Sequence, residues 1–499
     1  MTLDFSPQTT ADLADSEAAE GMLPPMTVEE CHAVFRRWLG AEYDTDALDA
    51  VLATAAVERL DGDPVWLWLI SGSGNAKTET VGALAGMGAH VLSTIASQGA
   101  LLSATSKREH TQDATGGLLR KIGDRGIVVI KDVTSILSMS GDQRGEVLGA
   151  LREVYDGRWS RNVGTDGGQT LEWVGRLVVI GAVTTAWDKA HSVISAMGDR
   201  FVLVRMDSSQ GRQAAGRQAI GNTGHEAAMR RELATAVARV MAGMQPRGIE
   251  VTEKETDVLL DAADVVTRAR TAVEHNYRGD VIDAHAPEMP TRFAKQLTQI
   301  VRGAVAIGID RRAALRLAIR CARDSMPPPR LRVLDDVAAN PDSPTKDVRK
   351  RLGLPRATVD RELQALNMLG VLTVDERDAV NPVNGRETTL WHYSLAHGIN
   401  PDALNPVLAV PEIAVPPQRA SDAVPEIAVP TQPSEGGTGP LHVPTADSGT
   451  ANGSSAPAHQ QCADASIPDF PNRTTDIGEA AEAGRGLALA APRGVRLVS

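Results

Sequence analysis

The spacing of apolar residues along the 499-residue chain changes character several times. Apolar positions recur every three or four residues over 28–39 and 47–59, which predicts amphipathic helices. From Val65 to Met206, short runs of β-branched and other apolar residues alternate with helical segments. This alternation is typical of a parallel sheet whose strands are joined by helices, so we expect an α/β domain there. Helical spacing returns from about Glu226 to Arg323 and predicts a helical domain.

Two changes of composition divide the rest of the chain. The helix-breaking segment Met326–Arg330 (MPPPR) precedes a small unit that ends near Leu395. From about Asn400 onward the sequence is rich in proline, contains no lysine and repeats the octamer AVPEIAVP at 409–416 and 423–430. Such a segment buries too little apolar surface to offset the entropy of ordering, so we expect a disordered tail. The tail would serve as a solvated spacer or as a docking segment for an unknown protein partner.

Composition and charge argue against several classes of protein. The net charge of -12 is incompatible with a uniformly basic nucleic-acid coat, so any contact with DNA must come from local basic surfaces. Cys31, Cys321 and Cys462 lie far apart without CxxC spacing, which argues against a disulfide framework or a zinc site. No apolar run approaches the roughly 20 residues that span a bilayer, and the acidic start does not resemble a signal peptide. We therefore expect a cytoplasmic protein without membrane segments.

The segment Leu69–Thr80 (LISGSGNAKTET) nearly matches the phosphate-binding pattern GxxxxGK[ST]. Ser71 and Ala76 occupy the two glycine positions of that pattern. The segment follows a run that predicts a buried strand and precedes helical spacing, which is the context that the pattern requires. The sequence therefore predicts a degenerate phosphate loop, and the alternative is a glycine-rich turn before an ordinary helix.

The chemistry expected of this loop is the binding of ATP with Mg²⁺. Gly72 and Gly74 permit positive φ, so that backbone N–H groups and the helix N-terminus point at phosphate oxygens. Lys77 would bridge the β- and γ-phosphates, and Thr78 would ligate Mg²⁺. The predicted nucleotide-binding residues are Gly72, Ser73, Gly74, Asn75, Ala76, Lys77 and Thr78.

A second apolar run, Gly126–Val133 (GIVVIKDV), contains Asp132 at its end. A carboxylate at the end of such a strand is placed to hold the Mg²⁺ of a phosphate-loop ATPase. Val133 stands where many of these ATPases have a glutamate that polarises water. We expect either that Glu146 or Glu153 replaces it, or that hydrolysis is slow.

With two further segments, these residues resemble the AAA+ ATPases. The run Arg176–Asp188 (RLVVIGAVTTAWD) contains Thr184 and Thr185, and Arg200 directly precedes another apolar run. The resemblance implies that one of the two threonines senses the γ-phosphate and that Arg200 is an arginine finger for a neighbouring subunit of a homo-oligomer. It also implies that residues 211–326 form a lid whose Arg292 contacts nucleotide. The alternatives are an ordinary salt-bridged arginine for Arg200 and a helix-surface arginine for Arg292.

The segment Gly157–Gly175 (GRWSRNVGTDGGQTLEWVG) reads as a hairpin with its turn at Asp166 and Gly167. In the AAA+ clade that includes MCM and viral replicative helicases, a hairpin inserted here projects into a central pore and contacts nucleic acid. By this resemblance Arg158, Trp159 and Arg161 would supply phosphate contacts and a stacking face for a single strand. A surface hairpin without a role in nucleic-acid binding is the alternative.

The unit from Arg332 to Leu395 contains three helical segments followed by two runs that can pair as strands. It resembles a winged helix-turn-helix domain, a class that binds duplex DNA or, alternatively, protein. The residues expected to face DNA are Arg356, Thr358 and Arg361 on the recognition helix and a basic cluster beside it of Lys346, Arg349, Lys350 and Arg351.

Taken together, the sequence predicts an α/β protein with an AAA+-like phosphate-loop core, a helical lid, a winged helix-turn-helix domain and a disordered tail. The expected divisions are a disordered start (1–26), N-terminal helices (27–60), the ATPase core (61–210), the lid (211–326), the winged helix (330–396) and the tail (400–499). The expected function is ATP-dependent DNA engagement by a replicative helicase or initiator-like factor, for which the pairing of domains suggests a mobile element. The alternatives are a transcriptional regulator with a nucleotide-sensing domain and a non-catalytic scaffold with a decayed site.

Overall fold

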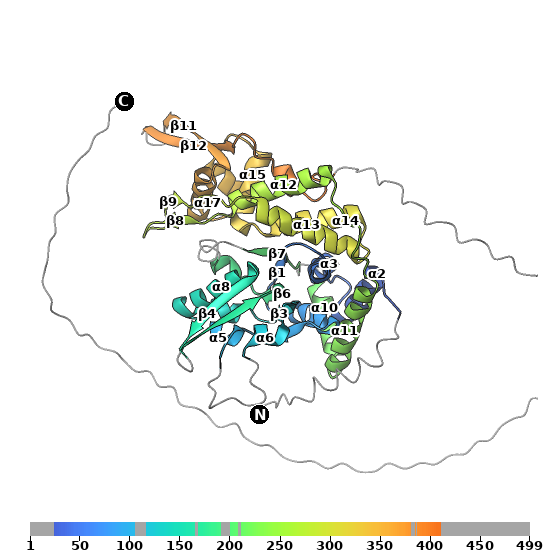
Figure 1. Ribbon diagram of the computed structural model, residues 1–499. Coiled ribbons are helices and arrows are strands. Elements are labelled where there is room, and N and C mark those ends of the chain that lie inside the picture. Colours follow the sequence, from blue (N-terminus) through green and yellow to red (C-terminus); the bar gives the residue numbers. More distant parts are fainter. Residues whose placement is uncertain are drawn as a thin grey trace, which may run out of the picture. The chain divides into compact units, whose positions relative to one another are not determined.

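Five apolar runs form a parallel β-sheet at the centre of the α/β region (Figure 1). The computed structural model describes residues 24–104, 116–164, 168–190, 200–207, 211–380, 385 and 387–410. The strand order across the sheet is β2-β3-β6-β1-β7, and all neighbouring strands pair in parallel. The strands are β1 (Trp66–Ile70), β2 (His90–Leu92), β3 (Arg125–Ile130), β6 (Arg176–Val183) and β7 (Phe201–Arg205). The predicted α/β class and the parallel sheet are therefore confirmed.

Both faces of the sheet are buried, which explains why its strands are continuous apolar runs. Trp66, Trp68 and Ile70 of β1 belong to one core, whereas Leu67 and Leu69 belong to the other. This division follows from the two-residue period of a strand, in which successive side chains point to opposite faces. Each face thus requires its own layer of helices.

Helices cover the two faces in separate groups. The core that contains Leu67 and Leu69 includes residues of α2 (Val28–Leu39), α3 (Thr45–Ala56), η1 (Val57–Arg59), α4 (Lys77–Gly82), η2 (Ala83–Met87) and α11 (Glu226–Ala242). The core that contains Trp66 and Trp68 includes residues of α5 (Gln98–Leu101), α6 (Leu118–Ile122), α7 (Thr134–Leu137) and α8 (Gly141–Tyr155). The exposed helix α10 (Arg212–Gly221) contacts α2.

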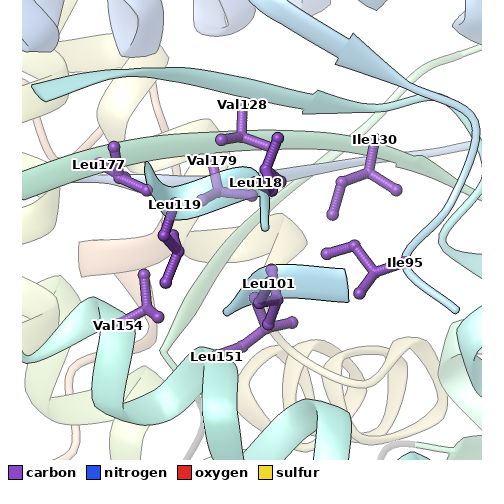
Figure 2. Close-up of a pocket in the computed structure, with 10 residues that line it drawn as sticks. All are labelled: Ile95, Leu101, Leu118, Leu119, Val128, Ile130, Leu151, Val154, Leu177 and Val179. Atoms are coloured by element: carbon purple, nitrogen blue, oxygen red, sulfur yellow. The ribbon is translucent and has the colours of Figure 1, made fainter. Parts of the chain in front are cut away.

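A small cavity lies in the second of these cores, between β3 and β6 and the helices α5, α6 and α8 (Figure 2). All of its lining side chains are apolar: Ile95, Leu101, Leu118, Leu119, Val128, Ile130, Leu151, Val154, Leu177 and Val179. A nucleotide needs hydrogen-bonding groups that this lining does not contain, so the cavity is a gap in the packing of the core and not a nucleotide site.

The helical region consists of α12 (Glu253–Ala269), α13 (Thr291–Ala306) and α14 (Arg311–Asp324). Between α12 and α13 the chain forms an antiparallel hairpin of β8 (Val273–His275) and β9 (Val281–Ala284). The helical spacing predicted the helices but not this hairpin, because strands of three or four residues are too short to show a clear two-residue period.

The unit after the breaker contains three helices and a three-stranded sheet. The helices are α15 (Pro328–Ala339), α16 (Thr345–Leu352) and α17 (Arg356–Met368). The sheet has the order β10-β12-β11 and consists of β10 (Ser343–Pro344), β11 (Leu372–Val380) and β12 (Glu387–Leu395). All three strands pair antiparallel; the predicted pairing of the last two runs is that of β11 with β12, whereas β10 was not predicted.

The predicted hairpin, which lies between the sheet strands β3 and β6, is also confirmed. Its strands β4 (Arg158–Val163) and β5 (Gln169–Val174) pair antiparallel, with Trp159 opposite Trp173. The predicted turn residues Asp166 and Gly167 lie outside the described residues.

The predicted boundary of the tail is too early. Residues Pro401–Leu404 form a short helix, η4, and Leu404 and Val410 are buried in the core that also contains α12 and α14. The apolar side chains of this segment are anchored by tertiary packing, which its proline-rich composition conceals. The predicted disorder of 1–23 and of the remaining tail concerns residues outside the described part of the chain. Among the described helices, none is long and apolar enough to cross a membrane.

Candidate nucleotide site and nucleic-acid surfaces

The candidate phosphate loop connects the end of β1 to the start of α4. Ser71 donates its N–H to Val183 O (3.2 Å), and the Asn75 amide donates to Ser71 Oγ (2.7 Å), so the start of the loop is tied to the sheet. Gly74 has φ +80°, as predicted, but Gly72 does not have a positive φ. A Cβ at Gly72 would lie 3.1 Å from the Asn75 amide nitrogen, so close packing is what favours glycine there.

Ala76 occupies the second glycine position in a left-handed conformation, with φ 57° and ψ 7°. Glycine adopts this conformation without strain, whereas a Cβ makes it unfavourable. Thr80 donates both its N–H and its hydroxyl to Ala76 O, at 2.9 Å each. The first turn of α4 therefore holds Ala76 in the backbone conformation for which the motif normally uses glycine.

The loop leads directly to Lys77, the first residue of α4. Its side chain is buried, and its ammonium donates to Gly72 O across the loop. Burial lowers the pKa of Lys77, and the nearby Asp132 carboxylate partly offsets this by raising it. The structure thus brings together the two charged residues that the sequence predicted for one site. Ser73, Gly74 and Thr78 are exposed at the same loop.

Asp132 follows the end of β3 after one intervening residue. Thr134 connects it to β6. The Asp132 Oδ1 accepts the N–H of Thr134 at 2.9 Å. The Thr134 hydroxyl in turn accepts the N–H of Thr184 (3.2 Å) and lies 3.3 Å from the Thr184 hydroxyl. Thr184 therefore lies beside Asp132 through Thr134, while Thr185 is exposed in the following turn. Thr134 was not predicted from the sequence, although the tripeptide Asp132–Thr134 (DVT) places its hydroxyl two residues after the carboxylate.

Val133, between these residues, is buried and cannot polarise water. Glu146, one of the two proposed substitutes, is on α8 and accepts a hydrogen bond from the Gln98 amide (3.1 Å). Glu153 is exposed two turns further along α8. No described contact links either carboxylate to Asp132.

A second polar cluster lies at the same edge of the sheet. Arg205, the last residue of β7, is aligned with Ile70, the last residue of β1 before the phosphate loop. Arg320 of α14 donates to Arg205 O (2.9 Å) and forms a bidentate ion pair with Asp44, the N-cap of α3. The arginine of the helical region that lies at the phosphate-loop edge is therefore Arg320. Its spacing within α14 gave the sequence analysis no reason to single it out among several arginines.

Arg200 and Arg292 lie at the opposite edge. Arg200 precedes Phe201, which pairs with Trp66 at the start of β1, and it forms an ion pair with Asp156 (2.9 Å). Burial raises the pKa of the Tyr155 phenol to about 12, and Arg292, which pairs with Glu288, lies close enough to offset part of that rise. The Tyr155 ring packs edge-on against Trp66, with centroids 5.3 Å apart. The length of β1, about 13 Å at roughly 3.3 Å per residue, separates both arginines from the phosphate loop of the same chain.

The hairpin β4–β5 corrects the prediction for Trp159. Trp159 is only 7% exposed and packs in the core with Leu171 and Trp173, so it is not a free stacking face. Arg158 and Trp159 are consecutive strand residues and must point to opposite faces. Arg161 lies on the inner face with Trp159 and donates to Leu102 O (2.8 Å). Of the three, only Arg158 is largely exposed, at 70% of its side chain, with Glu172 3.7 Å away.

The basic residues of α16 and α17 differ in their surroundings. Lys346, Arg349 and Lys350 are exposed on α16. Arg351 instead forms a bidentate ion pair with Asp336 of α15 (2.8 and 2.7 Å), so its guanidinium joins two helices.

On α17, Arg356 is 78% exposed and pairs only with Asp360 one turn along the helix, at 3.3 Å, among the described ion pairs. Thr358 is partly buried. Arg361 packs against the β8–β9 hairpin, where it donates to Arg278 O (3.4 Å). The predicted recognition surface is therefore accessible at Arg356 but shared with a neighbouring hairpin at Arg361.

Comparisons with known proteins add little to this geometry. No protein-family model and no curated protein sequence matches the chain. One similar solved structure is the A form apo structure of the NrS-1 C-terminal region, at 13% identity and a TM-score of 0.25. The alignment covers 50% of this chain and 57% of that one. A likeness at this level decides neither fold nor function, so the assignment of the site depends on the residues described above.

Proposed function

We propose that this chain is an ATP-binding AAA+ ATPase that engages DNA through a winged helix-turn-helix domain, as a replicative helicase or initiator-like factor does. One observation carries the proposal: Lys77, Asp132 and Thr184 come from three different strand ends and meet at one edge of the sheet. The order of strands supports it, because β6 with its threonines lies between β1 and β3, as an AAA+ core requires. Parallel α/β sheets bind their ligands at this carboxyl edge.

The residues of the loop fit the phosphates of ATP. Among the described residues, the backbone N–H groups of Gly72, Ser73, Gly74 and Ala76 donate no backbone hydrogen bond, so they are free to cradle an anion. Lys77 adds a positive charge, and Thr78 and Asp132 are oxygen ligands of the kind that Mg²⁺ prefers. The metal would neutralise charge that develops on the phosphates. The hydroxyls of Thr184 and Thr134 would lie beside the metal.

The position of two arginines at the end of the sheet opposite the phosphate loop supports assembly into a homo-oligomer. Arg200 and Arg292 lie at the end of β1 that is remote from the chain's own loop, so each can reach a nucleotide only in another copy. Arg200 is paired with Asp156, which is half exposed, and this pair would have to exchange for a phosphate contact.

The unit after 330 supports binding of duplex DNA. Arg356, Lys346, Arg349 and Lys350 are exposed on two adjacent helices, which concentrates positive charge locally on a chain of net charge -12. Recognition helices of helix-turn-helix proteins present such side chains from their N-terminal turns, where Arg356 lies.

Measurement of ATP turnover with and without single- and double-stranded DNA tests the proposal. We expect DNA to stimulate turnover by the wild type, and Lys77→Ala to abolish ATP binding or turnover because the charge at the loop is lost. Lys295→Ala is the matched control, since Lys295 is 69% exposed and pairs with Asp63 away from the loop. Unchanged ATP affinity and hydrolysis in Lys77→Ala would show that the site is assigned wrongly.

A further inference from the structure

The tip of the β8–β9 hairpin presents an aromatic side chain to solvent. Tyr277 is 89% exposed, and it lies between the strands, in the turn Asn276–Asp280. Large apolar or aromatic side chains that are this exposed contribute nothing to the core, so folding does not explain a tyrosine at this position.

The turn that holds Tyr277 is well determined by hydrogen bonds. The Asn276 side-chain oxygen accepts the N–H of Arg278 (2.8 Å) and of Asp280 (3.0 Å), while its amide donates to the Asp280 carboxylate (3.0 Å). Gly279 completes the turn with φ +82°. Tyr277 is therefore held outward by a pre-formed turn, which reduces the entropy lost when it binds a partner.

The same turn packs against helix α17. Arg361 donates to Arg278 O, and a Cβ added at Gly279 would lie 2.6 Å from the Arg361 guanidinium. The positive φ of Gly279 favours glycine at this position, and any larger residue would also have to displace the Arg361 guanidinium. The hairpin tip and the outer face of α17 therefore form one continuous surface.

The chemistry of this surface suits nucleic acid. The Arg278 guanidinium lies 5.2 Å from the centre of the Tyr277 ring and donates to its hydroxyl (2.8 Å). Neither Arg278 nor Arg361 forms an ion pair with an acidic side chain among the described residues. The acidic groups of α17 are paired, Asp360 with Arg356 and Glu362 with Arg330. The hairpin adds three carboxylates of its own: Asp280 accepts the Asn276 amide, Glu274 lies 3.5 Å from His285, and Asp283 accepts the N–H of Ala284. A cationic pair with an open aromatic face matches the phosphates and bases of a nucleic acid.

We infer that the β8–β9 tip binds a single-stranded segment of nucleic acid next to a duplex held by α17. Tyr277 stacks on the face of an unpaired base, which is not accessible when the base is paired and stacked inside a duplex. Arg278 contacts the adjacent phosphate. The position next to a duplex rests on the function proposed above for α17, whereas the stacking role of Tyr277 does not.

Fluorescence anisotropy with the full chain tests this inference on three labelled DNAs: a blunt duplex, the same duplex with a thymine extension, and the thymine strand alone. Tyr277→Ala should weaken binding of the extended duplex and of the single strand about fivefold or more, and leave the blunt duplex unaffected. Tyr277→Phe should retain wild-type binding, because the ring is kept. Arg278→Ala should reduce the slope of log affinity against log salt for the single strand by about 0.7.

Ile220→Ala is the control for loss of an exposed apolar side chain. Ile220 is 76% exposed and lies on α10, outside the β8–β9 hairpin. The inference would be overturned if the Tyr277→Ala protein bound the extended duplex and the single strand as tightly as the wild type does. A change in oligomeric state of that variant in analytical ultracentrifugation would not rescue it. Arg356→Ala separates the two hypotheses. If it leaves blunt-duplex binding unchanged, the duplex role of α17 fails, and binding of the single strand alone still decides the role of Tyr277.

Discussion

Replacement of Ala76 by glycine should stabilise the protein, the opposite of the usual effect of this substitution. Ala76 has φ 57° and ψ 7° at the start of α4, and it is one of two residues other than glycine with positive φ in the described part of the chain. The left-handed conformation costs an L-residue about 1–2 kcal/mol. Glycine removes this strain and completes one of the two missing glycines of the phosphate loop.

The expected gain is smaller than the strain that is removed. Glycine also gives the unfolded chain more freedom, which offsets about 0.4–1 kcal/mol, so the net stabilisation is about 0.5–1 kcal/mol. Urea titration followed by tryptophan fluorescence measures it, because Trp66 and Trp68 lie on β1 directly before the loop. The substitution leaves Lys77 in place, so binding of Mg²⁺ and ATP should be at least as tight as in the wild type.

Ala219→Gly provides a control of opposite sign. Ala219 is exposed within α10. Glycine there should destabilise the protein by about 0.5–1 kcal/mol, because the backbone of glycine loses more conformational entropy than that of alanine when it is fixed in a helix. If Ala76→Gly destabilised the protein as Ala219→Gly does, Ala76 would not be left-handed in the folded state. The loop would then not be pre-formed for phosphate.

Three further substitutions test other parts of the structure. Arg158→Ala should leave ATP binding intact and lower the stimulation of ATP turnover by DNA; full stimulation in a folded Arg158→Ala protein would remove the hairpin from the mechanism. Trp159→Ala should instead destabilise the fold by about 3–5 kcal/mol, because Trp159 is buried. Burial raises the pKa of Asp324 to about 6, so the folded state binds this proton more tightly than the unfolded state, and this contribution to stability is lost as the pH rises through 6. Asp324→Asn should therefore weaken the pH dependence of the unfolding free energy between about pH 4 and 6, and an identical dependence in urea titrations of both proteins would contradict the assignment.

The sheet could be predicted from the sequence because its physics is local. Strands buried on both faces must be apolar throughout, and Val178, Val179 and Ile180 of β6 illustrate such a run. The polar residues that follow these strands then had to meet at one edge, since the strands are parallel. Lys77 was predicted from the phosphate-binding pattern and Asp132 from its place near the end of an apolar run, whereas Thr184 was implied by the resemblance to the AAA+ ATPases.

Residues whose position depends on tertiary packing were harder to predict. Arg292 and Arg320 are both arginines of the helical region, and only the packing of α13 and α14 on the sheet places them at opposite edges. Trp159 is different, because the two-residue period of a strand already forbids it from sharing a face with Arg158. Arg361 could not have been foreseen, since the hairpin that covers it is formed by residues about 80 positions earlier in the chain.

The unit after 330 is joined to the helical region through a buried side chain, which changes how the DNA binding proposed for it should be tested. Arg330 is 7% exposed, donates to Ala269 O (2.8 Å) and Thr271 O (2.6 Å) at the end of α12, and pairs with Glu362 of α17. A fragment that begins at 332 would lack this arginine and leave Glu362 without its partner. It would also expose apolar residues of a core that continues from α12 into α17. Loss of binding by such a fragment would therefore report on its folding, and only substitutions in the full chain, such as Arg356→Ala, can show whether α17 reads DNA.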